Sequence, residues 1–207
     1  MLTSKTVQQF LDEVASNSPA PGGGSVSALA GALGAALTSM VCRLTIGKKK
    51  YSDVQSEVEE VLRKSEELRG QFTAIINEDT EVFNKVMTAF SLPKETNEQK
   101  TRRNEAIQEA TKAATLVPLK LMQKCSEAIL LAGVAAQKGN VNSVSDAGVS
   151  AFLIQSACDG AFYNVRINLA SLEDKSFSSQ TLARAEGIRS SVTSVAREIH
   201  SISQAKL

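Results

Sequence analysis

The feature that most limits the fold is residues 53–90, a stretch with no proline and a single glycine, Gly70. A continuous helix over this stretch would be about 57 Å long at 1.5 Å per residue. Its apolar residues recur at alternating steps of four and three, the spacing of helices that pack nearly side by side. They are Val54, Val58, Val61, Leu68, Phe72, Ile75, Val82 and Val86.

Helical spacing of apolar residues continues through the rest of the chain. Thr6 and Gln9 have the spacing of a capping box at a first helix. Pro118 either kinks a long helix or starts a new one. No stretch shows the alternation of a strand, so we predict one all-α domain, residues 1–207, built as a multihelical up-and-down bundle of long antiparallel helices. The expected helices are 6–16, 25–45, 53–90, 97–117, 118–138, 146–169 and 179–205.

Asp79 interrupts the apolar seam of residues 53–90. The four-and-three steps place this acid where the pattern calls for a hydrophobic residue. One interpretation is structural: a buried aspartate paired with a cap or a base, which fixes the register of the helices. The other is functional, because burial raises the pKa of a carboxyl group and suits it to proton transfer near neutral pH.

The stretch 18–25, Ser-Pro-Ala-Pro-Gly-Gly-Gly-Ser, leads into an uncharged run of small and apolar residues, 26–42. We expect Ser25 to cap that helix. The simplest interpretation is a tight turn before a buried helix; alternatively Gly22, Gly23 and Gly24 present backbone N–H groups to an anion or a carbonyl oxygen. The run is long enough to span a membrane, but its Ala, Gly, Ser and Thr content favours a closely packed core helix.

Composition excludes several classes of function. A net charge of +1 gives no broad nucleic-acid footprint, although two short basic clusters, residues 48–50 and 102–103, suit a small polyanion. His200 is the only histidine, which disfavours a histidine-based metal site or a Ser-His-Asp triad. Three separated cysteines indicate free thiols in a reducing cytosol. The first 18 residues are amphipathic and unlike a secretory signal, so we expect a cytoplasmic protein without a membrane partner.

A second polar loop, residues 139–146, contains Asn140 and Asp146. It leads into another helix, so Ser145 or Asp146 are simple capping candidates. The functional alternative is a polar rim that offers hydrogen-bond donors and acceptors to a flat heterocycle.

Four separated motifs together resemble one family, that of the C-terminal domain of formiminotransferase-cyclodeaminase and the methenyltetrahydrofolate cyclohydrolases. The likeness covers nearly the whole chain. The motifs are the glycine stretch 18–25, Asp-Thr-Glu-Val-Phe at 79–83 with Leu-Pro-Lys at 92–94, Gly139-Asn140 with Ser145-Asp146, and Asn-Val-Arg-Ile-Asn-Leu at 164–169.

The resemblance implies an all-helical homodimer without a metal or redox cofactor, acting on a one-carbon derivative of tetrahydrofolate. The family's proposed proton donor corresponds to Asp79; a second aspartate of many relatives is replaced by Asn77. Cyclohydrolase action, which opens the 5,10-methenyl compound to 10-formyltetrahydrofolate, is the expected reaction. Cyclodeaminase action on the 5-formimino compound is the alternative, and a helical dimerisation module is the non-enzyme alternative.

The same resemblance suggests which side chains bind the folate. Asn140, Asp146 and Asn168 are expected to bind the pterin or orient the reacting carbon. The glycine stretch through Ser25, with Lys49 and Lys50, is expected to meet the glutamate tail, because backbone N–H groups and lysines suit an anion.

Overall fold

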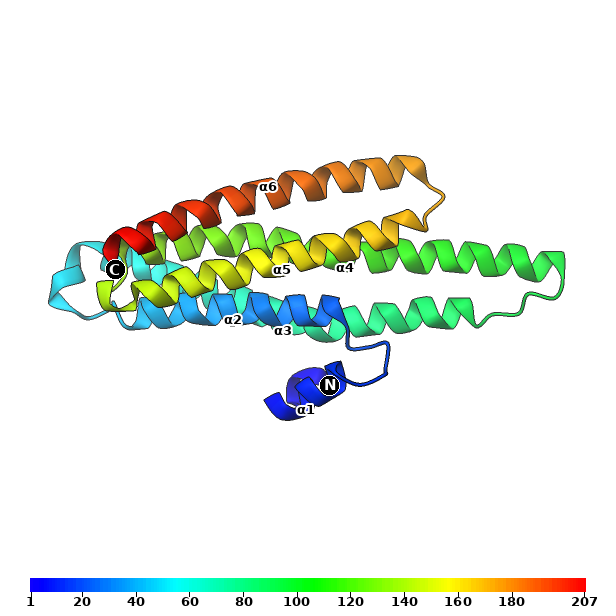
Figure 1. Cartoon of the computed structure of the whole chain (residues 1–207), viewed down its shortest axis with the longest axis horizontal. Helices are drawn as coiled ribbons and strands as arrows, with labels where there is room; N and C mark the ends of the chain where they lie inside the picture. The colour runs from blue at the N-terminus through cyan, green and yellow to red at the C-terminus, as the bar shows by residue number, and fades with distance from the viewer.

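The computed structural model describes all 207 residues and contains helices and no strands. The long helices run alternately up and down, with α1 set to one side (Figure 1). This confirms the predicted all-α bundle. The helices are α1 (Val7–Val14), α2 (Gly23–Arg43), α3 (Gln55–Phe90), α4 (Asn97–Lys138), α5 (Val144–Ala170) and α6 (Lys175–Lys206), with short 3-10 helices at Leu2–Ser4, Lys49–Val54 and Val141–Ser143.

Pro118 lies inside α4 and does not end it. Proline has no N–H to donate to the carbonyl group four residues earlier, which here belongs to Ala114. The side chain of Asn168 on α5 supplies the missing donor: its Nδ2 lies 3.1 Å from the Ala114 oxygen. One helix of 42 residues therefore replaces the two that a break at Pro118 would have produced.

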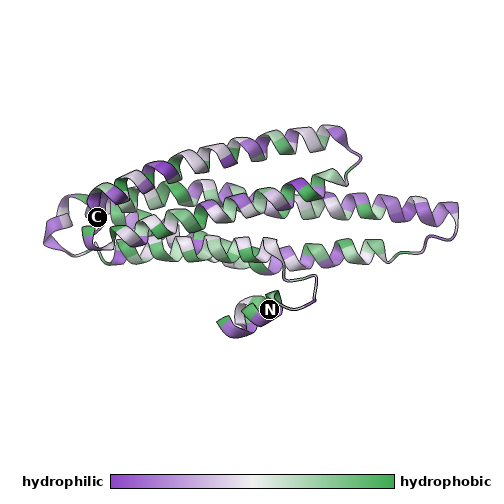
Figure 2. Ribbon diagram, viewed as in Figure 1, coloured by the Kyte–Doolittle hydropathy of each residue, from purple (hydrophilic) through white to green (hydrophobic).

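The core lies among α2, α3, α4 and α5, and α6 packs across α4 and α5. Apolar residues line the inner helix faces, and polar residues cover the outside (Figure 2). Small residues of α2 allow close approach within the chain: a Cβ added at Gly31 would lie 2.8 Å from Phe72, and one at Gly34 would lie 2.6 Å from Ile154. By length and composition α2 could span a membrane, but 61% of its most apolar window is buried in the bundle.

The helix starts show which capping predictions were correct. Thr6 and Gln9 form the expected capping box. Ser25 is not an N-cap, because α2 begins two residues earlier, after Gly22, and the serine hydroxyl bonds elsewhere. Ser145 and Asp146 do not cap α5 either, since that helix begins after Ser143.

The helices differ in length, and this leaves part of the bundle uncovered. The hairpin of α3 and α4 projects beyond the N-terminus of α2 and beyond the turn between α5 and α6 (Figure 1). Past the start of α2, the faces of α3, α4 and α5 that α2 covers elsewhere are free to line a cleft.

Candidate functional site

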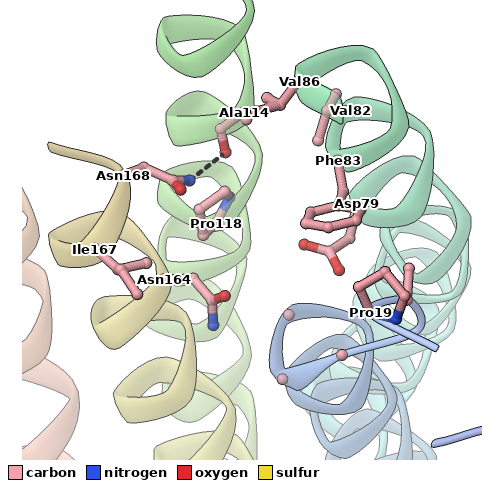
Figure 3. Close-up of a pocket in the computed structure, with 14 residues that line it drawn as sticks. Pro19, Asp79, Val82, Phe83, Val86, Ala114, Pro118, Asn164, Ile167 and Asn168 are labelled. Atoms are coloured by element: carbon pink, nitrogen blue, oxygen red, sulfur yellow. Dashed lines mark hydrogen bonds between the residues drawn. The ribbon is translucent and has the colours of Figure 1, made fainter. Parts of the chain in front are cut away.

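A cavity of about 320 Å³ occupies the space above the N-terminus of α2. Figure 3 shows α3 on one side, α5 on the other, α4 behind, and the start of α2 below. The cavity exists because α2 begins partway along α3 and leaves the space between α3 and α5 unfilled. Its lining comprises Pro19, Ala20, Gly22, Gly23, Gly24, Asp79, Val82, Phe83, Val86, Ala114, Pro118, Asn164, Ile167 and Asn168.

Asp79 is the only ionisable residue in this lining. The hydroxyl group of Ser25, whose side chain is fully buried, lies 2.9 Å from Asp79 Oδ2. The same hydroxyl is 3.1 Å from the Ile76 carbonyl oxygen and 3.3 Å from Thr80 Oγ1. A carboxylate is the strongest acceptor among these three, so the serine proton is best donated to Asp79. Ser25 thus fixes the carboxyl group at the cavity wall.

The pKa of Asp79 is raised above its ordinary value, chiefly by burial, while the hydroxyl and backbone N–H of Ser25 partly oppose that rise. No base neutralises the group: Lys120 pairs instead with the neighbouring Glu78, at 2.8 Å. A desolvated carboxyl group that faces a cavity and has no ion-pair partner has the properties of a general acid or base.

Glycine at position 24 is required by the position of Asp79. A Cβ added there would clash with Oδ1 of Asp79 and would lie 2.5 Å from Cγ and 2.7 Å from Oδ2. The absence of a side chain lets the carboxyl group lie directly against the first turn of α2. Anions are stabilised at this positive end of a helix, so the dipole also favours the ionised form of Asp79.

The start of α2 has backbone donors without partners inside the helix. Gly22 caps it without a side chain, and the first intrahelical bond runs from Val26 N to Gly22 O at 3.1 Å. The N–H groups of Gly23, Gly24 and Ser25 therefore have no intrahelical acceptor. Because Gly23 and Gly24 line the cavity, their N–H groups are available to an oxygen or nitrogen atom of a ligand.

The opposite wall carries two amides, Asn164 and Asn168, one helical turn apart on α5. The Nδ2 atom of Asn164 donates to the Gly160 carbonyl at 2.9 Å, and that of Asn168 donates to Ala114. Because both NH₂ groups are engaged, the two amide oxygens remain as acceptors. A ligand with N–H donors on one edge and a flat apolar body suits this wall. Asn164 was not among the predicted site residues, although its one-turn spacing from Asn168 was a readable signal.

The folded chain brings together one group of the predicted residues. Gly22, Gly23, Gly24, Asp79 and Asn168 all line the cavity. Ser25 lies beneath the Asp79 carboxyl group and not in the lining, so its contribution to a site passes through Asp79.

The remaining predicted residues lie at the other end of the bundle, and one chain does not bring them to the cavity. Asn140 bonds to the Leu44 carbonyl through Nδ2, at 3.0 Å, and ties this end together. Lys49 and Lys50 are exposed in the adjacent 3-10 helix, and Asp146 lies in the first turn of α5. The 21 residues of α2 separate this end from Gly23 by about 31 Å.

Asn77, the position at which many relatives carry a second acid, faces away from the cavity. Its Oδ1 accepts from the Leu2 backbone N–H at 2.8 Å, and its Nδ2 donates to Thr3 Oγ1 at 3.2 Å. This asparagine holds the N-terminal segment against α3, and Asp79 is the single acid of the site. No group of three or more His, Cys, Asp or Glu side chains is arranged to hold a metal ion.

Comparison with known proteins supplies a family for this site. Residues 6–187 match the family model described as formiminotransferase-cyclodeaminase. The chain is 44% identical, over the full length of both proteins, to methenyltetrahydrofolate cyclohydrolase of Methylorubrum extorquens. It is 36% identical over 183 residues to formimidoyltransferase-cyclodeaminase of Rattus norvegicus, of which it spans 34%.

A solved structure has the same fold. The crystal structure of formiminotetrahydrofolate cyclodeaminase from Thermotoga maritima superposes with a TM-score of 0.89 at 28% identity. The match covers 99% of this chain and 98% of that one. The chain therefore belongs to the formiminotransferase-cyclodeaminase family, as the four sequence motifs indicated.

Proposed function

We propose that this protein hydrolyses 5,10-methenyltetrahydrofolate to 10-formyltetrahydrofolate, with Asp79 as general acid and base. The observation that carries the proposal is the position of Asp79: a desolvated carboxyl group at a cavity wall, held by Ser25 at 2.9 Å. The full-length identity of 44% to a protein named for this reaction supports the choice of substrate.

The reaction requires two proton transfers at one carbon. The ionised Asp79 takes a proton from water as the water oxygen bonds to the cationic methenyl carbon between N5 and N10. The resulting neutral intermediate carries a hydroxyl group on a tetrahedral carbon. Asp79 then returns the proton to N5 as the carbon–N5 bond breaks, and the hydroxyl proton leaves to solvent as the formyl carbonyl forms. One positioned carboxyl group contributes about 10²–10⁴-fold in such a role.

The rest of the cavity fits the substrate's heterocycle. The free amide oxygens of Asn164 and Asn168 suit the N–H donors of a pterin edge. The backbone N–H groups of Gly23 and Gly24 lie on the same side as Asp79 and suit the oxygen that develops negative charge as water attacks. Every group in this scheme is supplied by the chain and the substrate, so the proposal includes no cofactor.

Cyclodeaminase action is the second candidate, supported by the name of the Thermotoga relative. There N10 attacks the formimino carbon, and a protonated Asp79 would give its proton to the departing ammonia. The two reactions need opposite starting forms of the same carboxyl group. The helical dimerisation module has no comparable support, because the relatives are named as enzymes.

A homodimer in the cytoplasm remains part of the proposal. Apolar side chains stay exposed on the outer faces of α2 and α5, among them Leu33, Phe152 and Tyr163, at 49, 51 and 62%. An apolar surface of this kind is typical of a subunit contact.

Measuring both reactions with the purified chain tests the assignment. Loss of methenyltetrahydrofolate is followed by its near-ultraviolet absorbance, and ammonia release is followed with 5-formiminotetrahydrofolate. We expect a higher kcat/KM for the hydrolysis. A higher value for ammonia release would assign the protein to the second candidate, and no acceleration of either reaction would refute the enzyme assignment.

A further inference from the structure

A second groove continues from the cavity along the projecting hairpin of α3 and α4. It has a volume of about 430 Å³ and shares Val82 with the cavity. Figure 3 shows Val82, Val86 and Ala114 at the end of the cavity from which this groove leads. The groove is lined by Val82, Lys85, Thr88, Ala89, Leu92, Ala106, Glu109, Ala110 and Ala113.

The lining of this groove is apolar, with a single cation. Ala106, Ala110 and Ala113 follow one another at helical spacing on α4, and their small side chains leave a shallow, flat wall. Lys85 lies on the α3 side and takes part in none of the ion pairs of the chain. Its charge is available to a ligand. Glu109 on the α4 side is the one acid of the lining.

We propose that this groove holds the p-aminobenzoyl-glutamate part of the folate, with the benzoyl ring on the alanine wall and a glutamate carboxylate bound by Lys85. The inference rests on the proposed function, because it needs the pterin in the cavity beside Asp79. It replaces Lys49 and Lys50, which the chain holds at the other end of the bundle.

The dimensions agree with this assignment. Asp79 and Lys85 are six residues apart on one helix, a rise of about 9 Å. Standard bond lengths place the glutamate α-carboxylate of a folate about 9 Å from N10 when the benzoyl amide is extended. A folate with its reacting carbon at Asp79 therefore brings a carboxylate level with Lys85.

Binding of 5-formyltetrahydrofolate, a stable analogue, tests the assignment without requiring turnover. Calorimetry would compare this ligand with its glutamyl diamide, which keeps the shape and loses the negative charges. We expect Lys85→Glu to weaken binding of the acid about tenfold and to leave binding of the diamide within twofold, since only the acid makes a charged contact. Glu109→Gln should act in the opposite direction and tighten the acid alone.

Two further variants separate the contributions of charge and wall. Lys100→Glu, an exposed lysine of the same hairpin outside the groove, should change neither affinity. Ala110→Leu fills the alanine wall and should weaken acid and diamide equally. Saturating methenyltetrahydrofolate should restore the wild-type kcat in Lys85→Glu, as expected for a residue that binds the tail and not the reacting carbon.

Three results would overturn the assignment: unchanged binding of the acid by Lys85→Glu, equal weakening of acid and diamide, or a changed oligomeric state with unchanged affinity. The last would assign the groove to a subunit contact. Absence of turnover by the wild-type protein, with folate binding intact, would instead refute the proposed function.

Discussion

Adding one methyl group at Gly24 should displace the Asp79 carboxyl group and leave the bundle folded. The built Cβ lies 2.5 Å from Asp79 Cγ and 2.7 Å from Oδ2. Since carbon atoms in ordinary contact are about 3.5 Å apart, the carboxyl group of Gly24→Ala must retreat by about 1 Å. That movement also disturbs the 2.9 Å contact with the Ser25 hydroxyl.

A displacement of this size predicts a large kinetic effect. Misplacing a catalytic group by about 1 Å costs on the order of 10²-fold, so kcat/KM for methenyltetrahydrofolate hydrolysis should fall by about that factor. Stability should change little, because alanine within a helix gains about 0.5–1 kcal/mol over glycine and offsets part of the clash. The rate is measured from the loss of near-ultraviolet absorbance, and helix content from far-ultraviolet circular dichroism.

Gly23→Ala is the matched control. Its added Cβ lies no closer than 3.8 Å to any neighbour, which is Asn164 Nδ2, and this is an ordinary contact. The substitution makes the same chemical change one residue away in the same helical turn, so kcat/KM should stay within a fewfold of wild type. Wild-type activity in Gly24→Ala, or an equal loss in both variants, would refute the argument that Gly24 positions Asp79.

Three further predictions follow from the site. Ser25→Ala removes a hydrogen bond that lowers the pKa of Asp79, so the acidic limb of the kcat/KM profile for hydrolysis should move to higher pH; an unmoved limb would exclude Asp79 as its source. Asp79→Asn should be at least as stable as wild type at neutral pH: the folded pKa of Asp79 is raised, so wild type loses stability relative to the variant as pH rises from the usual aspartate value through the folded one, and urea titrations at pH 3.5 and 7 would reveal a difference that should vanish at the lower pH. Asn168→Ala should cost about 1–3 kcal/mol in urea unfolding by leaving the Ala114 carbonyl without its donor, and a cost near zero would contradict the role assigned to that amide.

The order of helices and the exceptional position of Asp79 could be predicted from the sequence, because both depend on local periodicity. The four-and-three spacing of α3 continues without a break, and an acid in an apolar seam is visible in the sequence itself. The small residues of α2 likewise indicated close packing, which the contacts of Gly31 and Gly34 confirm.

The placement of the second polar loop could not be predicted, because it depends on Pro118. Had the helix ended there, the next helix would have reversed direction and carried Asn140 and Asp146 back towards the glycine turn. Instead, α4 continues through the proline and carries both residues to the opposite end. The compensating bond from Asn168 comes from a helix 50 residues further along the chain, and local sequence gives no sign of it.

The capping error at Ser25 has a related cause. A serine before an apolar helix is an ordinary N-cap in sequence terms. Its hydroxyl bonds instead to Asp79, 54 residues later in the chain. The tertiary contact overrides the local preference, and it does so at the site where the chemistry is proposed.

Asp79→Asn tests the central claim most directly when its hydrolysis of methenyltetrahydrofolate is compared with that of the wild-type protein. Asparagine keeps the shape of the side chain and an acceptor for Ser25, but cannot carry the proton. If Asp79 is the general acid and base, kcat should fall by about 10²–10⁴-fold with unchanged helix content. Wild-type turnover by a correctly folded Asp79→Asn protein would contradict the account.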